Sequence, residues 1–155
     1  MPIAGNYRWI VTDCNGTKGV YAPRAMAIRF VEIKAAESED ALNTEWVILT
    51  NDGKAPFSTR GCGVTVGRRG SAKKSLLGII DPGFVLAPGE RVRMLTGNPG
   101  TQAHGTAPED GVKNYFLFLP KPYVAAGAVL TLVLRGLPVS KAEFDPAAPQ
   151  GVKAS

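Results

Sequence analysis

The chain has 155 residues, with 18 Lys and Arg against 13 Asp and Glu, and therefore a formal net charge of +5. Its hydrophobic content of 45% excludes a wholly disordered chain, because enough apolar surface is present to offset the entropy lost on ordering. The 18 glycines and 12 prolines exclude a coiled coil and favour many turns between short strands. The composition therefore predicts one soluble, mostly β domain.

Short runs of β-branched and aromatic residues, separated by turn residues, predict the strands of this domain. The first run, 7–12, is followed by an Asn-Gly turn at 15–16 and a returning strand near 20–21. The later expected strands cover residues 27–34, 45–50, 62–66, 92–96, 115–119 and 129–134, and an extended piece at 84–90 ends in a Pro-Gly turn. No helix of more than a turn or two is expected.

The run 27–34 alternates well enough to assign its two faces. Alternation with a period of two places Ile28 and Phe30 on one face of this strand. It places Ile33 on the other face, together with Arg29 and Val31. The sequence leaves open which of the two faces is buried.

Three segments without strand periodicity are expected to be surface loops. Glu37, Glu39 and Asp40 form an acidic loop that lacks the twelve-residue ligand spacing of an EF-hand calcium site. Residues 67–75 form the most basic stretch of the chain. Residues 97–114 show no periodic pattern, and long loops of this kind are often associated with function or partner contact.

About seven short strands separated by turn signals favour a two-sheet sandwich over a barrel. We therefore expect an all-β fold, an immunoglobulin-like two-sheet β-sandwich with extended N- and C-terminal arms. Residues 1–27 are expected to form an arm or an extra strand, 28–140 the sandwich and 141–155 an extended tail. Pro138 or its neighbours are expected to close the domain.

Three sequence motifs carry a resemblance to a known family. They are FVEI at 30–33, EWVILTNDG at 45–53, and FVLAPGE at 84–90 followed by Val92 and Thr96-Gly97. In this order and at these separations, they make residues 28–134 similar to the lamin-tail domain family, a small immunoglobulin-like β-sandwich of nuclear lamins and many bacterial proteins. The resemblance implies an interaction module, with structural roles for Glu45 and Glu90 at a strand edge and a turn.

The sequence contains few groups suited to catalysis or metal binding. His104 is the one histidine, which excludes a zinc site built from several, and Cys14 and Cys62 allow at most one disulfide. No motif brings Cys62 and His104 together, although a small hydrolase using both remains an alternative. The segment 70–75 lacks the glycine that a phosphate-binding loop places directly before its lysine. We therefore expect no enzyme activity, no cofactor and no metal.

A cluster of basic residues is the candidate contact with an anionic partner. Its members are Arg60, Arg68, Arg69, Lys73 and Lys74, with no acidic residue between them. Such a cluster suits salt-dependent binding of phosphates, but it also suits a solubilising loop or a contact with an acidic patch of a neighbouring subunit. No aromatic residue interleaves with these charges, which argues against base stacking.

These features favour a non-catalytic structural or interaction protein, a repeated subunit that decorates or cements a large assembly such as a phage capsid or tail. We expect protein subunits as partners, a homo-oligomer, and assembly contacts through Tyr7, Trp9 and Phe144 in the arms. The alternative is a nucleic-acid or envelope-associated module of lamin-tail type that uses the basic loop.

The apolar segments are too short to cross a membrane as a helix. The longest, 124–134, has 11 residues, whereas a membrane-spanning helix needs about 20. The first residues lack the basic start and apolar run of a secretory signal. We therefore expect a soluble protein of a virion or of the bacterial cytoplasm.

Overall fold

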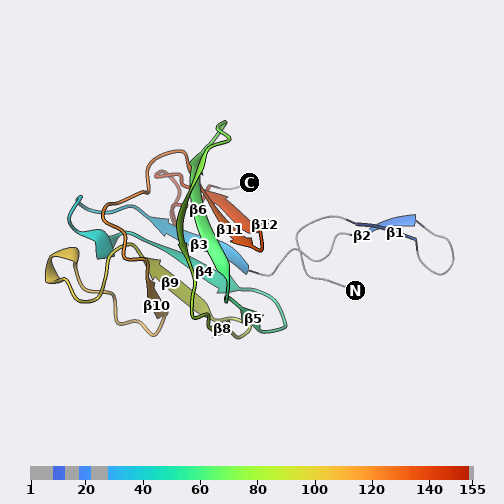
Figure 1. Ribbon diagram of the computed structural model, residues 1–155, viewed down its shortest axis with the longest axis horizontal. Coiled ribbons are helices and arrows are strands. Elements are labelled where there is room, and N and C mark those ends of the chain that lie inside the picture. The colour runs from blue at the N-terminus through green and yellow to red at the C-terminus, as the bar shows by residue number, and fades with distance from the viewer. Residues whose placement is uncertain (1–8, 13–17, 22–27, 154–155) are drawn as a thin grey trace.

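A computed structural model describes residues 9–12, 18–21 and 28–153 (Figure 1). In these residues the protein is all-β, and the helical segments are two short 3₁₀ turns, η1 (Leu42–Thr44) and η2 (Gln102–His104). The prediction of a mostly β protein is therefore confirmed. Within the described part of the chain, no helix is long and apolar enough to span a membrane.

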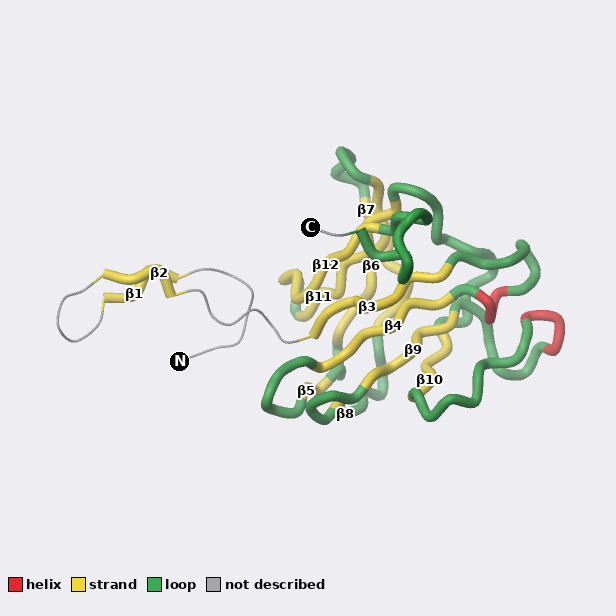
Figure 2. Tube along the Cα trace, turned by 180° about the vertical axis from the view of Figure 1, so that it is seen from behind, coloured by secondary structure: helices red, strands yellow, loops and turns green. Residues whose placement is uncertain are grey.

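Two four-stranded sheets and a small third sheet make up the fold of residues 28–153. The first sheet has the order β10 (Lys113–Phe116), β9 (Arg91–Leu95), β4 (Trp46–Asn51) and β3 (Ile28–Lys34), which lie side by side in Figure 2. The second has the order β12 (Leu137–Glu143), β11 (Ala128–Leu134), β6 (Cys62–Arg68) and β7 (Lys74–Ile79). The third pairs β5 (Phe57–Ser58) with β8 (Val85–Leu86). Neighbouring strands are antiparallel except β10 and β9, which are parallel.

Apolar side chains from both four-stranded sheets meet in one hydrophobic core. Val47 and Leu49 of β4 are fully buried in it, together with Val64 of β6 and Leu130 and Leu132 of β11. The spacing of two within each strand is that of side chains sharing one face. Burying such a side chain stabilises the fold by about 1.5–3 kcal/mol, so this shared core holds the two sheets together.

The two sheets also meet along both of their sides. On one side β12 contacts β3. On the other, the Tyr115 hydroxyl of β10 donates a hydrogen bond of 3.4 Å to the Ile79 carbonyl oxygen of β7. As a result, β7 and β10 form one side of the molecule, and β3 and β12 form the other.

A β-bulge changes the face assignment expected for β3. The pairing of β3 with β4 shifts register between Phe30 and Glu32, which leaves Val31 as an extra residue. An extra residue inverts the alternation beyond it. Ile33 therefore lies in the core with Ile28 and Phe30, and its predicted place on the opposite face is wrong.

The chain continues past Pro138 as a full strand, contrary to the prediction that the domain closes there. Pro138 lies near the start of β12, opposite Val133 and beside a register shift in the pairing with β11. A proline without its N–H is tolerated at such a bulge on an outer strand. The proline signal therefore did not mark the end of the domain.

The segment predicted as an extended C-terminal tail, 141–155, belongs to the body of the protein through residue 153. Phe144 is a core residue, 8% exposed, and forms an antiparallel bridge with Val152. The Ile33 N–H donates a hydrogen bond of 2.9 Å to the Gln150 carbonyl. The Phe144 side chain is therefore held in this core and not in a free arm, and its role as an assembly contact stays a prediction.

The predicted basic loop at 67–75 is the end of a β-hairpin. β6 continues to Arg68 and β7 begins at Lys74, so the turn is confined to residues 69–73. Lysine and glycine are poor strand formers, which is why the local sequence did not indicate β7. Pairing with β6 supplies the hydrogen bonds that local propensity does not favour.

The two strands expected near the N-terminus are present. β1 (Trp9–Thr12) pairs antiparallel with β2 (Lys18–Tyr21), and Trp9 lies opposite Tyr21. Tyr7 and the side chain of Trp9, both predicted assembly contacts, lie outside the described residues and atoms.

Candidate functional site

Four of the five predicted cationic residues lie together at the end of the β6–β7 hairpin. Arg68 is the last residue of β6, Lys74 is the first of β7, and Arg69 and Lys73 occupy the turn between them. All four are exposed. Arg60 precedes β6 at its opposite end, about 20 Å away for a seven-residue strand, and does not join this group.

An open cleft of about 680 Å³ lies beside this end of the hairpin. Its walls come from β3, the β6–β7 hairpin, β11, β12 and the C-terminal segment. The charged side chains of this basic cleft are Arg29, Arg68, Arg69, Lys74, Lys141, Lys153 and Glu143. Six cations therefore surround one carboxylate, and three of them come from segments that the sequence did not link to the hairpin.

Acidic groups neutralise only part of this positive charge. Glu143 lies 2.9 Å from the Arg69 guanidinium and 3.9 Å from the Lys153 ammonium. The cationic partners are exposed, Arg69 at 66% and Lys153 at 42%, so water screens these pairs and another anion can compete for the two cations. Arg29 pairs with Asp52, which does not line the cleft.

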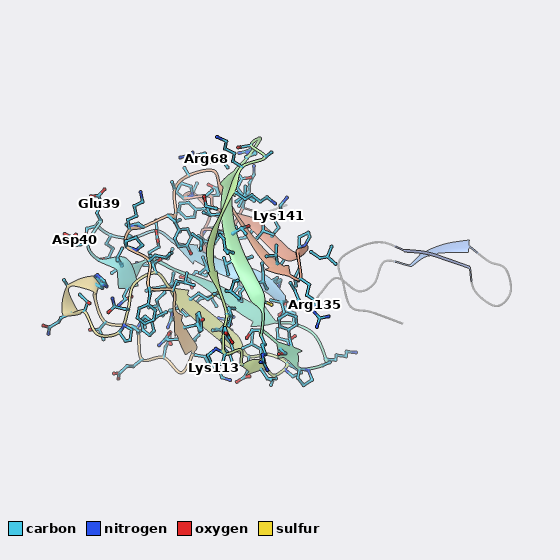
Figure 3. All side chains as sticks on the ribbon, in the orientation of Figure 1. Glu39, Asp40, Arg68, Lys113, Arg135 and Lys141 are labelled. Carbon is cyan, nitrogen blue, oxygen red and sulfur yellow. The ribbon has the colours of Figure 1, made fainter. Side chains whose placement is uncertain are left out.

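The remaining three cations of the cleft, Arg68, Lys74 and Lys141, have no ion pair within residues 28–153. Figure 3 shows Arg68 at the end of the hairpin and Lys141 below it on β12, both away from Glu39 and Asp40. The cleft therefore presents unneutralised positive charge suited to carboxylate or phosphate groups. Its one aromatic side chain, Phe30, is 4% exposed and offers no face for stacking a base.

Cys62 is poorly suited to act as a nucleophile. It lies in the core and is fully buried, and burial raises the pKa of its thiol to about 11. At neutral pH the thiol therefore remains protonated, whereas the thiolate is the reactive form. Within the described residues, no group of three or more His, Cys, Asp or Glu is placed to hold a metal ion.

His104, the other member of the hydrolase alternative, lies in η2 of the long loop. Its Nδ1 is buried beside Gly97, where an added Cβ would lie 2.9 Å from that nitrogen. This histidine therefore packs closely against the backbone of Gly97, as a side chain with a structural role does.

Glu45 and Glu90 hold loops in place. The fully buried carboxylate of Glu45 accepts hydrogen bonds from the Thr96 hydroxyl at 2.7 Å and from the N–H groups of Tyr123 and Val124 at 3.1 and 3.0 Å. Glu90 accepts a bond of 2.7 Å from the Ala87 N–H across the Pro-Gly turn. Burial is the main cause that raises the pKa of the Tyr123 hydroxyl, and the negative charge of Glu45 raises it further.

Comparison with known proteins adds no family to these geometric findings. Neither the models of known protein families nor the curated proteins gave a match.

Proposed function

We propose that this protein is a non-catalytic binding protein whose basic cleft receives acidic groups of a neighbouring subunit in a large assembly. In this proposal it is a repeated, homo-oligomeric subunit that decorates or cements the assembly, with a phage capsid or tail as the leading example. The observation that carries the proposal is the cleft, in which six cationic side chains surround the single carboxylate of Glu143. Such an excess of charge steers and orients an anionic partner.

We also propose an immunoglobulin-like sandwich of lamin-tail type for residues 28–140. Two four-stranded sheets with a shared core support this proposal. The Pro-Gly turn of the resemblance is closed by Glu90, as a turn residue of that motif would require. A stiff β body of this kind suits a protein that presents a binding surface rather than one that closes over a substrate.

An acidic protein surface fits the cleft better than a nucleic acid does. Glu143 already occupies the cleft as a carboxylate partner of Arg69, so the geometry accepts the group that an acidic side chain would bring. The absence of an exposed aromatic side chain among the residues lining the cleft disfavours single-stranded nucleic acid.

The second candidate is a module that binds the backbone of duplex nucleic acid. The three unpaired cations of the cleft favour it, because phosphate contacts need charge and no base recognition. This candidate predicts duplex binding that weakens steeply as salt is raised.

Removal of the three unpaired cations tests both candidates. The triple variant Arg68→Ala, Lys74→Ala, Lys141→Ala is compared with a control that removes equal charge elsewhere, at three exposed positions. The control changes Lys54, Arg60 and Lys121 to Ala.

Binding of poly-glutamate and of a duplex DNA is measured for both variants by fluorescence anisotropy at low and physiological salt. We expect the wild type to bind poly-glutamate and the cleft variant to bind it about tenfold or more weakly, with the control unchanged. Equal losses in the two variants would show that net charge alone is responsible. Duplex DNA bound more tightly than poly-glutamate would favour the second candidate.

The size of the purified protein tests the assembly. Analytical ultracentrifugation is expected to show species larger than the 16.4 kDa chain. A single species at that mass over the whole concentration range would contradict the homo-oligomer.

A further inference from the structure

Among the strands that the structure describes, β7 is an edge strand of its sheet. It ends the order β12–β11–β6–β7 and pairs with β6 alone among the described strands. At its C-terminal end the Tyr115 hydroxyl bonds the Ile79 carbonyl oxygen. Over residues 74–77, none of the hydrogen bonds within residues 28–153 joins the backbone to an element other than β6. Unpaired backbone groups on such an edge are a template for another strand.

Two apolar side chains of β7 are exposed next to this edge. Leu76 is 58% exposed and Ile79 is 56% exposed. Leu76 lies over Gly63 of the neighbouring strand, where an added Cβ would be 3.2 Å from the leucine Cδ1. The edge therefore combines free backbone groups with an apolar surface on which side chains of an added strand can pack.

The N-terminal end of this edge, at Lys74, borders the basic cleft, whose other walls lie across β6 on the side of β3 and β12. Lys74, the first residue of β7, lines the cleft, and Arg68 faces it from the end of β6. A strand added along β7 would thus have one end beside unpaired cations and the other beside Ile79. Antiparallel pairing, the more stable arrangement, brings the C-terminal end of the added strand to Lys74.

We propose that the outer edge of β7 binds an extended segment of a partner protein. In this segment, apolar and polar residues alternate, and acidic residues follow them. The segment adds to the sheet antiparallel to β7, and its acidic C-terminal end lies in the basic cleft. This inference rests on the proposed function and names the kind of partner that the cleft receives.

Charge complementarity favours this occupant over segments of the chain itself. Residues 1–27 carry Arg8, Lys18 and Arg24 against Asp13, and so would add positive charge to a cationic site. The β7 strand of a second copy starts with its own Lys74, which follows Lys73 of the turn. An acidic segment is the occupant that the edge and the cleft attract together.

Two synthetic peptides of equal composition test the proposal. Each has six residues of alternating valine and threonine, with three glutamates either after or before this run. We expect the peptide with C-terminal glutamates to bind about tenfold more tightly to the full chain than its counterpart, by fluorescence anisotropy. Methylation of the backbone nitrogens that face β7 should weaken its binding by a further tenfold or so, because it removes about two hydrogen bonds.

Variants of β7 separate strand addition from charge attraction. Leu76→Lys and Ile79→Lys are each expected to weaken binding of the C-terminal-glutamate peptide, whereas Leu137→Lys, at an equally exposed leucine of β12, leaves it unchanged. Hydrogen exchange of the backbone amides in residues 74–77 should slow when the peptide is bound. Circular dichroism checks that each variant is folded.

Equal binding of the two peptides, with methylation and the β7 variants having no effect, would overturn the strand-addition proposal. If poly-glutamate binding by the cleft persisted in that case, the proposed function would stand. Loss of binding by both peptides and by poly-glutamate would overturn both proposals. Self-association of the wild type that Leu76→Lys abolishes would assign the edge to a second copy and also overturn the inference.

Discussion

The buried carboxylate of Glu45 provides the sharpest test of how this fold holds its loops. Glu45 lies just before β4 and is fully buried, and it accepts three hydrogen bonds from Thr96, Tyr123 and Val124. Two of the donors are backbone N–H groups of the loop that precedes β11. The carboxylate therefore ties this loop to the first sheet.

Glu45→Gln keeps the shape of the side chain but replaces one acceptor oxygen by an NH₂ donor. If the amide oxygen remains beside Thr96 and Tyr123, the NH₂ faces the Val124 N–H, and a buried donor is left without an acceptor. Such a loss costs about 1–3 kcal/mol of unfolding free energy. A loss of about 2 kcal/mol in the free energy of unfolding lowers Tm by about 4–8 °C in a chain of this size.

Thermal melts followed by circular dichroism, with urea titrations at the same pH, measure this loss. Glu39→Gln is the matched control, because it removes the same charge at an exposed loop position, and a change within about 0.5 kcal/mol is expected there. If Glu45→Gln destabilised the protein no more than this control, the three hydrogen bonds would not be what holds the loop.

Three further predictions concern acid stability, the C-terminal segment and the buried thiol. The Arg93 guanidinium, hydrogen-bonded to Asp110, lowers the pKa of that carboxyl to about 2. Its stabilising contribution is thus present above about pH 4 and lost as pH falls towards 2, so Asp110→Asn should reduce the fall in Tm over that range. Gly151 and Gly111 both have positive φ, but an added Cβ would lie 1.9 Å from a backbone oxygen of β3 at Gly151 and meet nothing within 4 Å at Gly111. Gly111→Ala should lower the free energy of unfolding in urea by ~1–2 kcal/mol, the cost of left-handed strain alone. Gly151→Ala should lower it by more. Equal losses in the two variants would contradict the docking of the C-terminal segment. With the other cysteine replaced by serine, Cys62 should react with iodoacetamide at pH 8 far more slowly in the native protein than in urea, because burial raises its pKa to about 11.

The fold elements that local patterns predicted well are those with strong strand signals. β4 and β11 were expected within one residue of their observed bounds, since runs of β-branched residues report directly on strand formation. β7 and β12 were missed, because two lysines, a glycine and a proline weaken their local signal and pairing with β6 and β11 stabilises them instead. The bulge at Val31 was not predicted for a similar reason, because a bulge is defined by the pairing with the partner strand.

The sequence by itself determined the β class, several of the turns and the closeness of Arg68, Arg69, Lys73 and Lys74 along the chain, because all of these depend on neighbouring residues. Only the tertiary structure decided that Arg29, Lys141 and Lys153 join three of those cations, Arg68, Arg69 and Lys74, in one cleft. It also decided that Phe144 belongs to the core and that, among the described strands, β7 pairs on one side only. These features depend on which distant strands pair, and that choice follows from burial and backbone hydrogen bonding over the whole chain rather than from any local pattern.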